Sequence, residues 1–323
     1  MLRISVIITN YNYGRYVDVA IQSALSLNGG AEVIVVDDGS TDNSRSVIDA
    51  FGSSVYKIYQ TNQSQTAAYN AGFAASTGDV VIFLDSDDLL DPSVGEELGS
   101  VWNERVSKVQ FQMQRIDEYG RPRGGVFPAY LPLPTPERIR HWVMTTGGYP
   151  SPPASGNAYA RRWLKEIFPL DPEADRAGDS FCLSVAPLFG DVVTVAKPLV
   201  FYRVHGANDS GHTSFAMHAD RAMKRFKYSQ GVARHRGVEL ADRLFFRNLE
   251  TTQFRAASMR FAREQHPIPD DSPLRAARNA LWALAFCPQV ELRRRGVLVL
   301  WVFGVLLLPL PLAKKAVVLR YRR

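Results

Sequence analysis

The amino-acid sequence predicts an α/β fold with a doubly wound, mostly parallel sheet, and two observations lead to that prediction. In the first 90 residues, short apolar segments alternate with segments whose apolar residues recur at helical spacing. This alternation is typical of parallel strands joined by crossover helices. Polar and acidic residues also follow the apolar segments directly, at the carboxyl ends of the expected strands, where open α/β sheets bind ligands.

Each element is expected from its own stretch of sequence. Apolar runs predict strands at 4–9, 33–37, 55–60, 80–84 and 108–113, and helical spacing predicts helices at 16–27, 42–51, 66–76 and 92–103. Further along we expect a strand and a helix within 156–168, a helix at 179–189, closing strands at 192–195 and 199–202, and a charged helical region from 215 to about 286. The segment 120–153 is rich in Pro and Gly and is predicted to be a long surface excursion.

Length and composition allow one large domain, or a domain with an appendage. The chain has 323 residues, of which 46% are hydrophobic, and this supports an ordinary core. Cys182 and Cys287 show no metal-ligand spacing and lie in apolar stretches, so buried, reduced thiols are expected. The sequence opens on a predicted strand instead of a secretory signal, and we therefore expect its chemistry on the cytoplasmic side.

Basic charge is concentrated at one end of the sequence. The formal net charge is +6, but the segment 291–323 alone holds eight basic residues and a single acid, Glu291, so the remainder is close to neutral. A nucleic-acid-binding surface would interleave basic residues with aromatic or polar base-reading residues. Here the basic residues flank an apolar run, which argues against nucleic acid and favours a membrane surface with anionic lipids as a partner.

The apolar run covers 296–313 and carries no charge over 18 residues, the lower limit of a membrane-spanning length. Pro309 and Pro311 interrupt its end, and the basic residues on both sides give no orientation by the positive-inside rule. We expect an interfacial or re-entrant anchor in a membrane-associating tail at 291–323. The alternative is a buried core helix.

Three carboxylates follow the predicted strand 80–84. Asp85, Asp87 and Asp88 crowd its carboxyl end, where they repel one another unless a cation or a proton neutralises them. Such a cluster is suited to a hard divalent cation and, through it, to the phosphates of a nucleotide. The alternative is an acidic helix start, in which Asp88 caps a helix that begins near Pro92.

Two more polar segments follow the first and second predicted strands. Thr9, Asn10 and Tyr11 end the first strand, and Asp37 and Asp38 end the second, followed by Gly-Ser-Thr-Asp. An Asp at such a place can accept hydrogen bonds from a base or ribose. Taken singly, each segment is better explained as a helix cap in a tight loop. Neither has the spacing of a GxGxxG or P-loop motif, so ordinary dinucleotide or P-loop chemistry is disfavoured.

Together these segments resemble a known enzyme family. The ordered stretches ISVIITNYN, VIVVDDGSTD, NQSQTAAYNAGFAASTGD and VIFLDSDD are similar to successive motifs of the family 2 inverting glycosyltransferases, which have the GT-A fold. The resemblance covers roughly residues 3–210. It implies a nucleotide-sugar donor, with UDP the expected nucleotide, a divalent cation (Mn²⁺ or Mg²⁺) as cofactor, and a single-displacement transfer of the sugar.

The resemblance also implies a role for individual residues. Thr9, Asn10 and Tyr11 would line the base pocket, Asp38 would contact the base with support from Asp37, and Asp85 would lie near the ribose and the metal. The remaining donor contacts would come from Ser86 and from the third motif, through Gln65 and Asn70. Asp87, the second acid of the DxD pattern, would coordinate the cation directly, with Asp88 in support. His205, in a segment similar to YRxHGxN, is a second candidate ligand for the metal or the diphosphate, the alternative being a structural hydrogen bond.

An inverting transfer requires a base for the acceptor hydroxyl, and Asp179 is the candidate implied by the family pattern. The alternative is that Asp179 only caps the helix that follows. Asn157 is a candidate for the acceptor side.

The sequence departs from the family pattern at three positions. Ser64 replaces a glycine, Tyr69 replaces a basic residue, and Gly178 stands where an acid often stands. The second departure puts a basic contact to the diphosphate in doubt, and the candidates to replace it are Arg161, Arg162 and Arg203.

We therefore expect a glycosyltransferase domain at 1–212, with a nucleotide-binding half at 1–103 and an acceptor half at 104–212, followed by a helical extension at 213–290 and the tail. The expected acceptor is a saccharide or a lipid-linked hydroxyl, in bacterial surface polysaccharide or glycolipid synthesis at the cytoplasmic face of the inner membrane. Three rivals remain: a sugar nucleotidyltransferase, a non-catalytic nucleotide-sugar-binding protein of the same fold, and a structural membrane adaptor.

Overall fold

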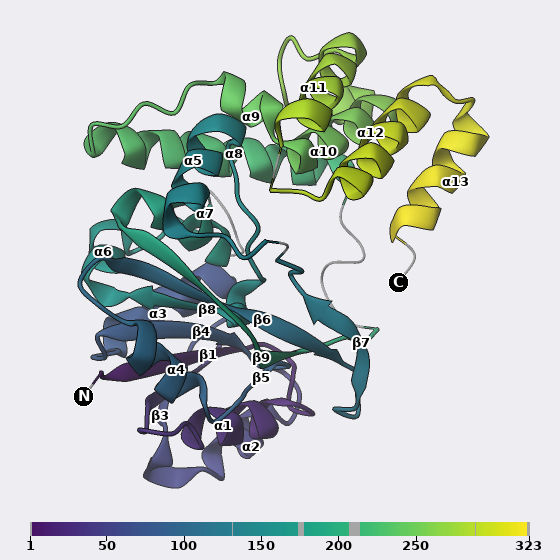
Figure 1. Ribbon diagram of the computed structural model, residues 1–323. Coiled ribbons are helices and arrows are strands. Elements are labelled where there is room, and N and C mark those ends of the chain that lie inside the picture. Colours follow the sequence, from purple (N-terminus) through teal and green to yellow (C-terminus); the bar gives the residue numbers. More distant parts are fainter. Residues whose placement is uncertain (1, 131, 174–177, 207–213, 288, 322–323) are drawn as a thin grey trace. The chain divides into compact units, whose positions relative to one another are not determined.

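The computed structural model describes residues 2–130, 132–173, 178–206, 214–287 and 289–321 (Figure 1). The chain forms two compact units. Unit 1 comprises Met1–Ile139 with Ser151–Asn208, and unit 2 comprises Arg140–Pro150 with Asp209–Arg323. The predicted α/β class and the helical character of the C-terminal region are confirmed.

Unit 1 contains a sheet of nine strands among the described residues. The order is β3-β2-β1-β4-β8-β6-β9-β5, with β7 paired to β6 outside this path. The strands are β1 (Ile4–Asn10), β2 (Glu32–Asp37), β3 (Tyr56–Tyr59), β4 (Val80–Asp85), β5 (Leu89–Leu90), β6 (Val106–Ile116), β7 (Pro122–Phe127), β8 (Asn157–Ala160) and β9 (Asp191–Arg203). Strands β3, β2, β1 and β4 are mutually parallel, as predicted, and so are β6 and β9. The strand and helix expected within 156–168 are β8 and the helix that follows it, but the sequence did not predict that β8 pairs antiparallel, nor did it predict β5 and β7.

Helices cover both faces of the sheet in unit 1 (Figure 1). Helices α1 (Val17–Leu25), α2 (Ser44–Asp49) and α4 (Val94–Val101) pack their apolar residues on one face against Val6 and Ile8 of β1. The opposite face is covered by α3 (Gln65–Ala75), α6 (Arg161–Ile167) and α7 (Asp179–Phe189). Because β1 and β4 are enclosed on both faces, their sequences are almost continuously apolar.

The prediction of a long surface excursion at 120–153 is wrong. This segment contains strand β7, which pairs antiparallel with β6, and helix α5 (Pro136–Thr146). Ile139, Trp142 and Val143 on α5 are buried. The prolines of this segment lie before and after the helix or at its first turn, where a missing backbone N–H costs no intrahelical hydrogen bond.

Unit 2 is helical. Its main helices are α8 (Phe215–His235), α9 (Arg243–Arg247), α10 (Leu249–Phe261), α11 (Pro273–Phe286), α12 (Leu292–Leu307) and α13 (Leu310–Tyr321). Helices α10, α11 and α12 share a core that includes Ala256, Ala280, Val302 and Val305.

The apolar run 296–313 does not form one continuous helix. It is divided between α12, which ends at Leu307, and α13, which begins at Leu310. One face of α12 is buried in the core of unit 2, as the alternative of a core helix required. Among the residues that the structure describes, none of the helices combines the length and the apolar character needed to cross a bilayer.

Candidate active site

The carboxyl ends of three parallel strands bring the predicted site residues to one edge of the sheet. In the strand register Asn10 of β1 lies beside Asp37 of β2, and Thr9 of β1 lies beside Asp85 of β4. Three segments that are far apart in the sequence therefore meet at this edge. This is the position where open α/β sheets bind their ligands.

Asp37 ties two loops together at the edge. Its carboxylate accepts hydrogen bonds from Asn10 Nδ2 at 2.8 Å, from the Ser40 hydroxyl at 2.6 Å and from the Ser40 backbone N–H at 2.9 Å. Asp37 and Asn10 are both almost fully buried. Asp37 thus supports both loops. Tyr11, which follows Asn10 directly, has 46% of its surface exposed at the same edge.

Asp38 fixes the loop that precedes α3. Its Oδ1 accepts from Gln60 Nε2 at 2.7 Å and from the Gln63 backbone N–H at 2.9 Å, and its Oδ2 accepts from the Ser64 backbone N–H at 2.9 Å. Gly39 makes this contact possible, because it has a φ of +78° and a Cβ there would lie 2.6 Å from the Asn62 nitrogen. The side chain predicted to contact a base is therefore held rigidly by its neighbours.

The acidic cluster at the end of β4 is electrostatically strained. Burial, followed by the charges of Asp87 and Asp179, raises the pKa of Asp85 well above its usual value, although Gln65 Nε2 donates to Asp85 Oδ1 at 2.8 Å. Burial and the charges of Asp87 and Asp85 likewise raise the pKa of Asp88. A cation or a proton is therefore favourable at this place. Asp88 Oδ1 accepts from the backbone N–H of Arg203, which joins the cluster to the end of β9.

Asp87 and His205 meet although 118 positions separate them. Asp87 Oδ2 lies 2.9 Å from His205 Nε2, and their side chains are 13% and 6% exposed. Tyr13 and Tyr16 pack against the His205 ring, with centroid distances of 5.5 Å and 5.1 Å. The imidazole is thus fixed in position beside the carboxylate.

These two side chains fit a divalent cation that also binds phosphate. No group of three or more His, Cys, Asp and Glu side chains able to hold a metal is found in the described part of the chain. Cations such as Mg²⁺ at nucleotide sites commonly use only one or two protein carboxylates, the remaining ligands being substrate phosphates and waters. Burial first, and then the neighbouring carboxylates, raise the pKa of Asp85 and of Asp88, and a cation would offset the repulsion between these carboxylates.

Asp179 is the first residue of α7 and lies near the acidic cluster. The N-cap of this helix is Gly178, so Asp179 does not occupy the capping position. Its charge contributes to the raised pKa of Asp85 and of the Tyr69 hydroxyl, which places it within electrostatic reach of both. The carboxylate is half-buried. A half-buried carboxylate beside the edge of the sheet can accept a proton from a bound hydroxyl.

Three of the sequence-predicted residues are buried or form hydrogen bonds with the protein backbone. The Asn70 amide exchanges two hydrogen bonds with the Leu170 backbone. Asn157, the acceptor-side candidate, is fully buried and donates to backbone carbonyls of 152–154. Ser86 is buried as well.

The arginines considered for the diphosphate also have protein partners. Arg203 is buried and donates to the backbone carbonyls of Asp87, Asp117 and Glu118. Arg161 donates to Ser76 and Arg162 to the Val106 carbonyl. In this arrangement all three guanidinium groups donate to the protein itself.

Sequence reasoning missed residues that position the site. Gln60 holds Asp38, and the Ser155 hydroxyl accepts from the Asp85 backbone N–H at 3.1 Å. Lys108 on β6 is fully buried, and its Nζ donates to Ser151 Oγ at 2.7 Å. Burial lowers the pKa of Lys108 well below its usual value, an effect that the nearby Asp179 opposes. A lysine within an apolar strand is the signal that could have identified this group.

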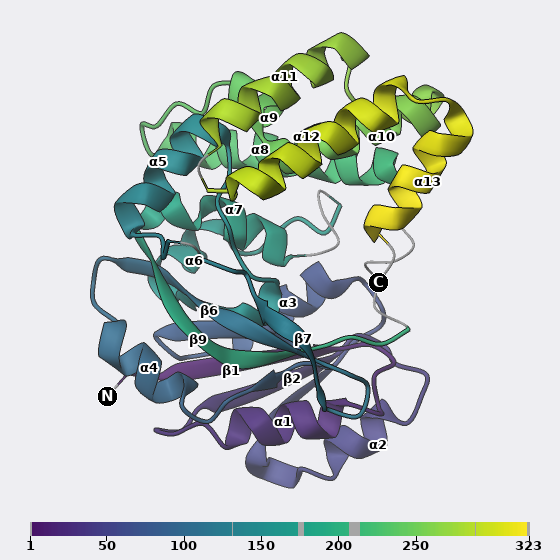
Figure 2. The same cartoon turned by 45° about the vertical axis from the view of Figure 1, so that its right-hand side comes forward.

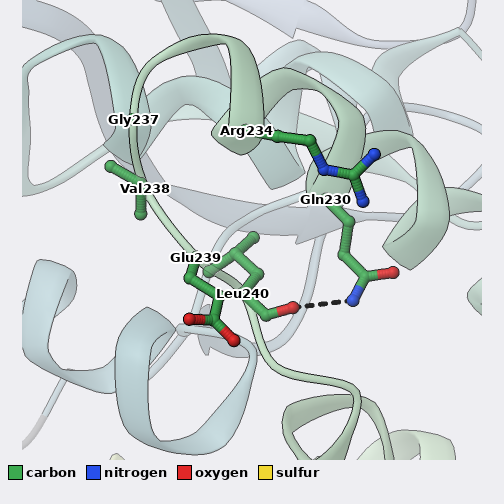
Figure 3. A pocket seen from close by; sticks show the side chains of 6 residues that line it. All are labelled: Gln230, Arg234, Gly237, Val238, Glu239 and Leu240. Carbon is green, nitrogen blue, oxygen red and sulfur yellow. Dashed lines mark hydrogen bonds between the residues drawn. The ribbon is translucent and has the colours of Figure 1, made fainter.

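Unit 2 has a hollow of a different kind, lined by Gln230, Arg234, Gly237, Val238, Glu239 and Leu240. Figure 3 shows the Gln230 amide turned toward the Leu240 carbonyl, to which it donates at 2.6 Å. The hollow holds one acid and one base but none of the predicted site residues. The strand-end cluster of unit 1 therefore remains the candidate active site.

Sequence relatives are named as glycosyltransferases. The chain is 39% identical over 216 residues to an uncharacterized glycosyltransferase, alr2836, of Nostoc sp., a match that covers 64% of this chain and 66% of the relative. It is 36% identical over 100 residues to glycosyltransferase GlyG of Streptococcus pneumoniae, covering 29% of this chain and 33% of that relative. The chain thus spans less than two thirds of the length of these curated relatives.

Solved structures share the fold. The 1-349 fragment of S. aureus TarS in complex with UDP-GlcNAc has a TM-score of 0.56 at 16% identity, covering 99% of this chain and 90% of the fragment. The mannosyltransferase PcManGT of Pyrobaculum calidifontis, in complex with GDP-Man and Mn²⁺, has a TM-score of 0.52 at 15% identity, covering 99% and 84%. The predicted GT-A fold is thereby supported.

The sequence profile described as glycosyl transferase family 2 matches residues 5–168. That range is about half of the 323 residues, and it includes β1, β2 and β4, whose ends build the cluster described above. A match of this extent, over the strands that carry the candidate site, places the chain in glycosyl transferase family 2.

Proposed function

We propose that the protein transfers a sugar from a nucleoside-diphosphate sugar to an acceptor hydroxyl, with inversion at the anomeric carbon. The observation that carries the proposal is the convergence of the Asp38 loop, the Asp85–Asp88 cluster and Asp179 at one edge of the sheet. A site for this reaction needs a nucleotide pocket, stabilisation of the leaving diphosphate and a base, and these three groups of residues match those needs.

The donor would bind across the ends of β1 and β2. Thr9 and Asn10 line this edge, Tyr11 offers an exposed ring for stacking on a base, and the loops of Asp37 and Asp38 enclose it. Complexes of structural neighbours with UDP-GlcNAc and with GDP-Man support a nucleotide sugar as the donor. UDP is the nucleotide that we propose to test first.

Asp87 and His205 are the residues that would hold a divalent cation, with Asp85 and Asp88 adding negative charge around them. Such a cation supplies Lewis-acid stabilisation of the negative charge on the departing diphosphate. The Mn²⁺ in the complex of PcManGT supports Mn²⁺ as the first cation to examine.

Asp179 would act as the general base. The acceptor oxygen attacks the anomeric carbon on the face opposite the diphosphate, while its proton passes to the Asp179 carboxylate. The bond from the anomeric carbon to the diphosphate oxygen breaks, and its electron pair leaves with the nucleoside diphosphate. One displacement of this kind inverts the anomeric centre.

For the acceptor we propose a saccharide or a lipid-linked hydroxyl in bacterial surface polysaccharide or glycolipid synthesis, at the cytoplasmic face of the inner membrane. The support is the basic, partly exposed apolar segment formed by α12 and α13. Family membership alone does not define the acceptor, because related folds serve many substrates.

The test combines binding and product analysis. Thermal unfolding is followed with UDP, GDP and their sugars, with and without Mn²⁺, since a ligand of the native state raises its stability. The donor that binds is then incubated with saccharide and lipid-linked acceptors, and the linkage is determined. We expect transfer by the wild type and none by Asp87→Ala, which should unfold at a similar temperature without ligand.

The rival functions predict other results. A non-catalytic binding protein would bind the donor without transfer or donor hydrolysis, and a nucleotidyltransferase would release pyrophosphate from a nucleoside triphosphate and a sugar phosphate. A structural adaptor would bind no nucleotide. Transfer by Asp87→Ala with metal chelated would refute the assigned site.

A further inference from the structure

The turn between α12 and α13 exposes an unusual run of apolar residues. Leu307, Leu308, Leu310 and Leu312 are 75%, 39%, 45% and 48% exposed, and Pro309 and Pro311 between them are exposed too. Figure 2 shows this turn as the bend that joins the two yellow helices. Six consecutive exposed apolar residues form a patch of the kind that marks an interaction site on soluble proteins.

The core of unit 2 does not account for this run. Helix α12 buries Trp301, Val302 and Val305, yet Val297 and Leu300 on its other side are 58% and 73% exposed. On α13, Val318 and Leu319 are 55% and 79% exposed. The exposed apolar surface therefore continues from the turn along both helices.

The turn has a fixed shape. The Trp301 indole N–H of α12 donates to the Ala316 carbonyl of α13 at 3.0 Å, and Arg260 Nη2 of α10 donates to the Leu308 carbonyl at 2.9 Å. The guanidinium of Arg320 lies 5.7 Å from the centre of the Trp301 ring. Unit 2 thus presents the leucines in a preformed arrangement.

Basic residues surround this surface. Arg293 and Arg294 at the start of α12 and Lys314, Lys315 and Arg320 on α13 are all exposed. No acidic residue occurs in the sequence from 292 to 321. Two copies of the chain joined through this surface would bring like charges together, whereas anionic lipid headgroups would be complementary to it.

We propose that the turn 307–312 enters the interfacial layer of an anionic bilayer, with the flanking lysines and arginines on the lipid headgroups. The apolar side chains gain by leaving water, and the basic side chains stay at headgroup level. The role of this membrane contact rests on the proposed function: it would hold the candidate active site near a membrane-bound acceptor. It narrows the interfacial or re-entrant anchor expected for the tail 291–323 to the turn 307–312, because one face of α12 belongs to the core.

The test is co-sedimentation of the full chain with vesicles, which requires neither nucleotide nor acceptor. We expect the wild type to bind vesicles of phosphatidylglycerol and phosphatidylcholine, and to bind pure phosphatidylcholine at least about tenfold more weakly. The triple variant Leu307→Ser, Leu310→Ser, Leu312→Ser should lose at least about tenfold in binding. Its matched control is Leu274→Ser with Leu281→Ser, two leucines of α11 that are 78% and 52% exposed and should tolerate the change.

A second variant examines the charges. Lys314→Gln with Lys315→Gln should weaken binding to anionic vesicles, and added salt should reduce the difference from the wild type. The unfolding temperature of each variant shows whether it is folded. The thermal shift with UDP shows whether donor binding is retained when lipid binding is lost. Unchanged sedimentation of the leucine triple variant would overturn the proposal. The proposal would also be overturned if the wild type did not bind vesicles and light scattering showed that it forms dimers, whereas the triple variant stays monomeric.

Discussion

Tyr69 fills the space that a side chain at position 178 would need. A Cβ at Gly178 would lie 2.9 Å from Tyr69 Cδ2 and 3.3 Å from Thr66 Cα. Tyr69 is fully buried and stacks on Phe83, with 4.2 Å between the ring centroids. Both positions depart from the family pattern, one by losing a basic residue and the other by losing an acid. The contact shows that the two departures are a single packing arrangement beside Asp179.

Replacing Gly178 by alanine should therefore destabilise the protein. The added methyl group meets an aromatic ring that is itself held by Phe83, so neither side can move without cost. We expect Gly178→Ala to lower the free energy of unfolding by about 1–3 kcal/mol, the usual cost of overpacking. Chemical denaturation monitored by circular dichroism measures this change.

Gly231→Ala is the matched control for that measurement. Gly231 lies within α8, and a Cβ there would meet nothing within 4 Å. This substitution should be neutral or stabilising by up to about 1 kcal/mol, because alanine favours the helix. In a Tyr69→Leu background, which removes the ring that the added methyl group would meet, Gly178→Ala should cost less free energy of unfolding than it does in the wild type. Equal denaturation midpoints for wild type and Gly178→Ala would contradict the packing argument.

The backbone of Ser64, another position that departs from the family pattern, is strained. It replaces the family glycine and has a φ of +104° and a ψ of 160°, a region that is essentially restricted to glycine. Its hydroxyl is buried and has no hydrogen-bond partner among the described residues. We expect Ser64→Gly to stabilise the protein by about 1–3 kcal/mol, the usual cost of such a backbone conformation.

Ser64→Ala separates the two contributions to that effect. Alanine removes the buried hydroxyl but keeps the Cβ, so it should recover only the polar part of the gain. Thermal unfolding of both variants gives the comparison. A glycine variant no more stable than the alanine variant would show that the backbone at 64 carries no strain.

The sequence was sufficient to locate the edge of the sheet that carries the candidate site. Strands β1, β2 and β4 are enclosed on both faces, so each reads as an apolar run that stops at a polar residue. Parallel pairing then brings Asn10, Asp37 and Asp85 together without any further information. The residues that end these strands could be predicted for this reason.

Other features depend on contacts that no local pattern records. Strand β8 has four residues, too few to show a period, and its antiparallel place between β4 and β6 comes from the sheet. The contact of His205 with Asp87 depends on where β9 ends. Helix α12 is apolar on almost every side, so its sequence does not show whether the helix packs in a protein core or lies in a membrane.

The base can be examined by Asp179→Asn, which keeps the shape of the side chain and removes its capacity to accept the proton. We expect kcat for transfer to fall by about 10²–10⁴-fold, the usual contribution of a general base. The dissociation constant of the donor should change little, since no contact with the donor is assigned to Asp179. Isothermal titration with the nucleotide sugar, beside initial-rate kinetics, distinguishes these effects. A matching loss of donor affinity would point to a binding role for Asp179.

A buried ionic group in unit 2 predicts how stability depends on pH. Arg255 donates two hydrogen bonds to Asp271, at 2.6 Å and 2.7 Å, and both side chains are fully buried. Burial alone would raise the pKa of Asp271, but the bonds and charge of Arg255 outweigh it and leave the pKa lowered. His266 Nε2 lies 3.3 Å from Asp271, and its Nδ1 lies 2.9 Å from Ser258 Oγ. Burial lowers the pKa of His266 despite the nearby Asp271.

Both groups act in the same direction. The pKa of each group is lower in the folded chain than in the unfolded chain, so the unfolded chain binds more protons on acidification. For His266 this begins as the pH falls below the usual histidine pKa of about 6.5, and for Asp271 as it falls below the usual aspartate pKa of about 3.9. Unit 2 should therefore lose stability in two stages on acidification. Hydrogen exchange of the α10 amides at a series of pH values measures this loss. His266→Gln should remove the first stage, whereas His235→Gln, exposed at the end of α8, should leave the profile unchanged. An unaltered first stage in His266→Gln would assign it to another group.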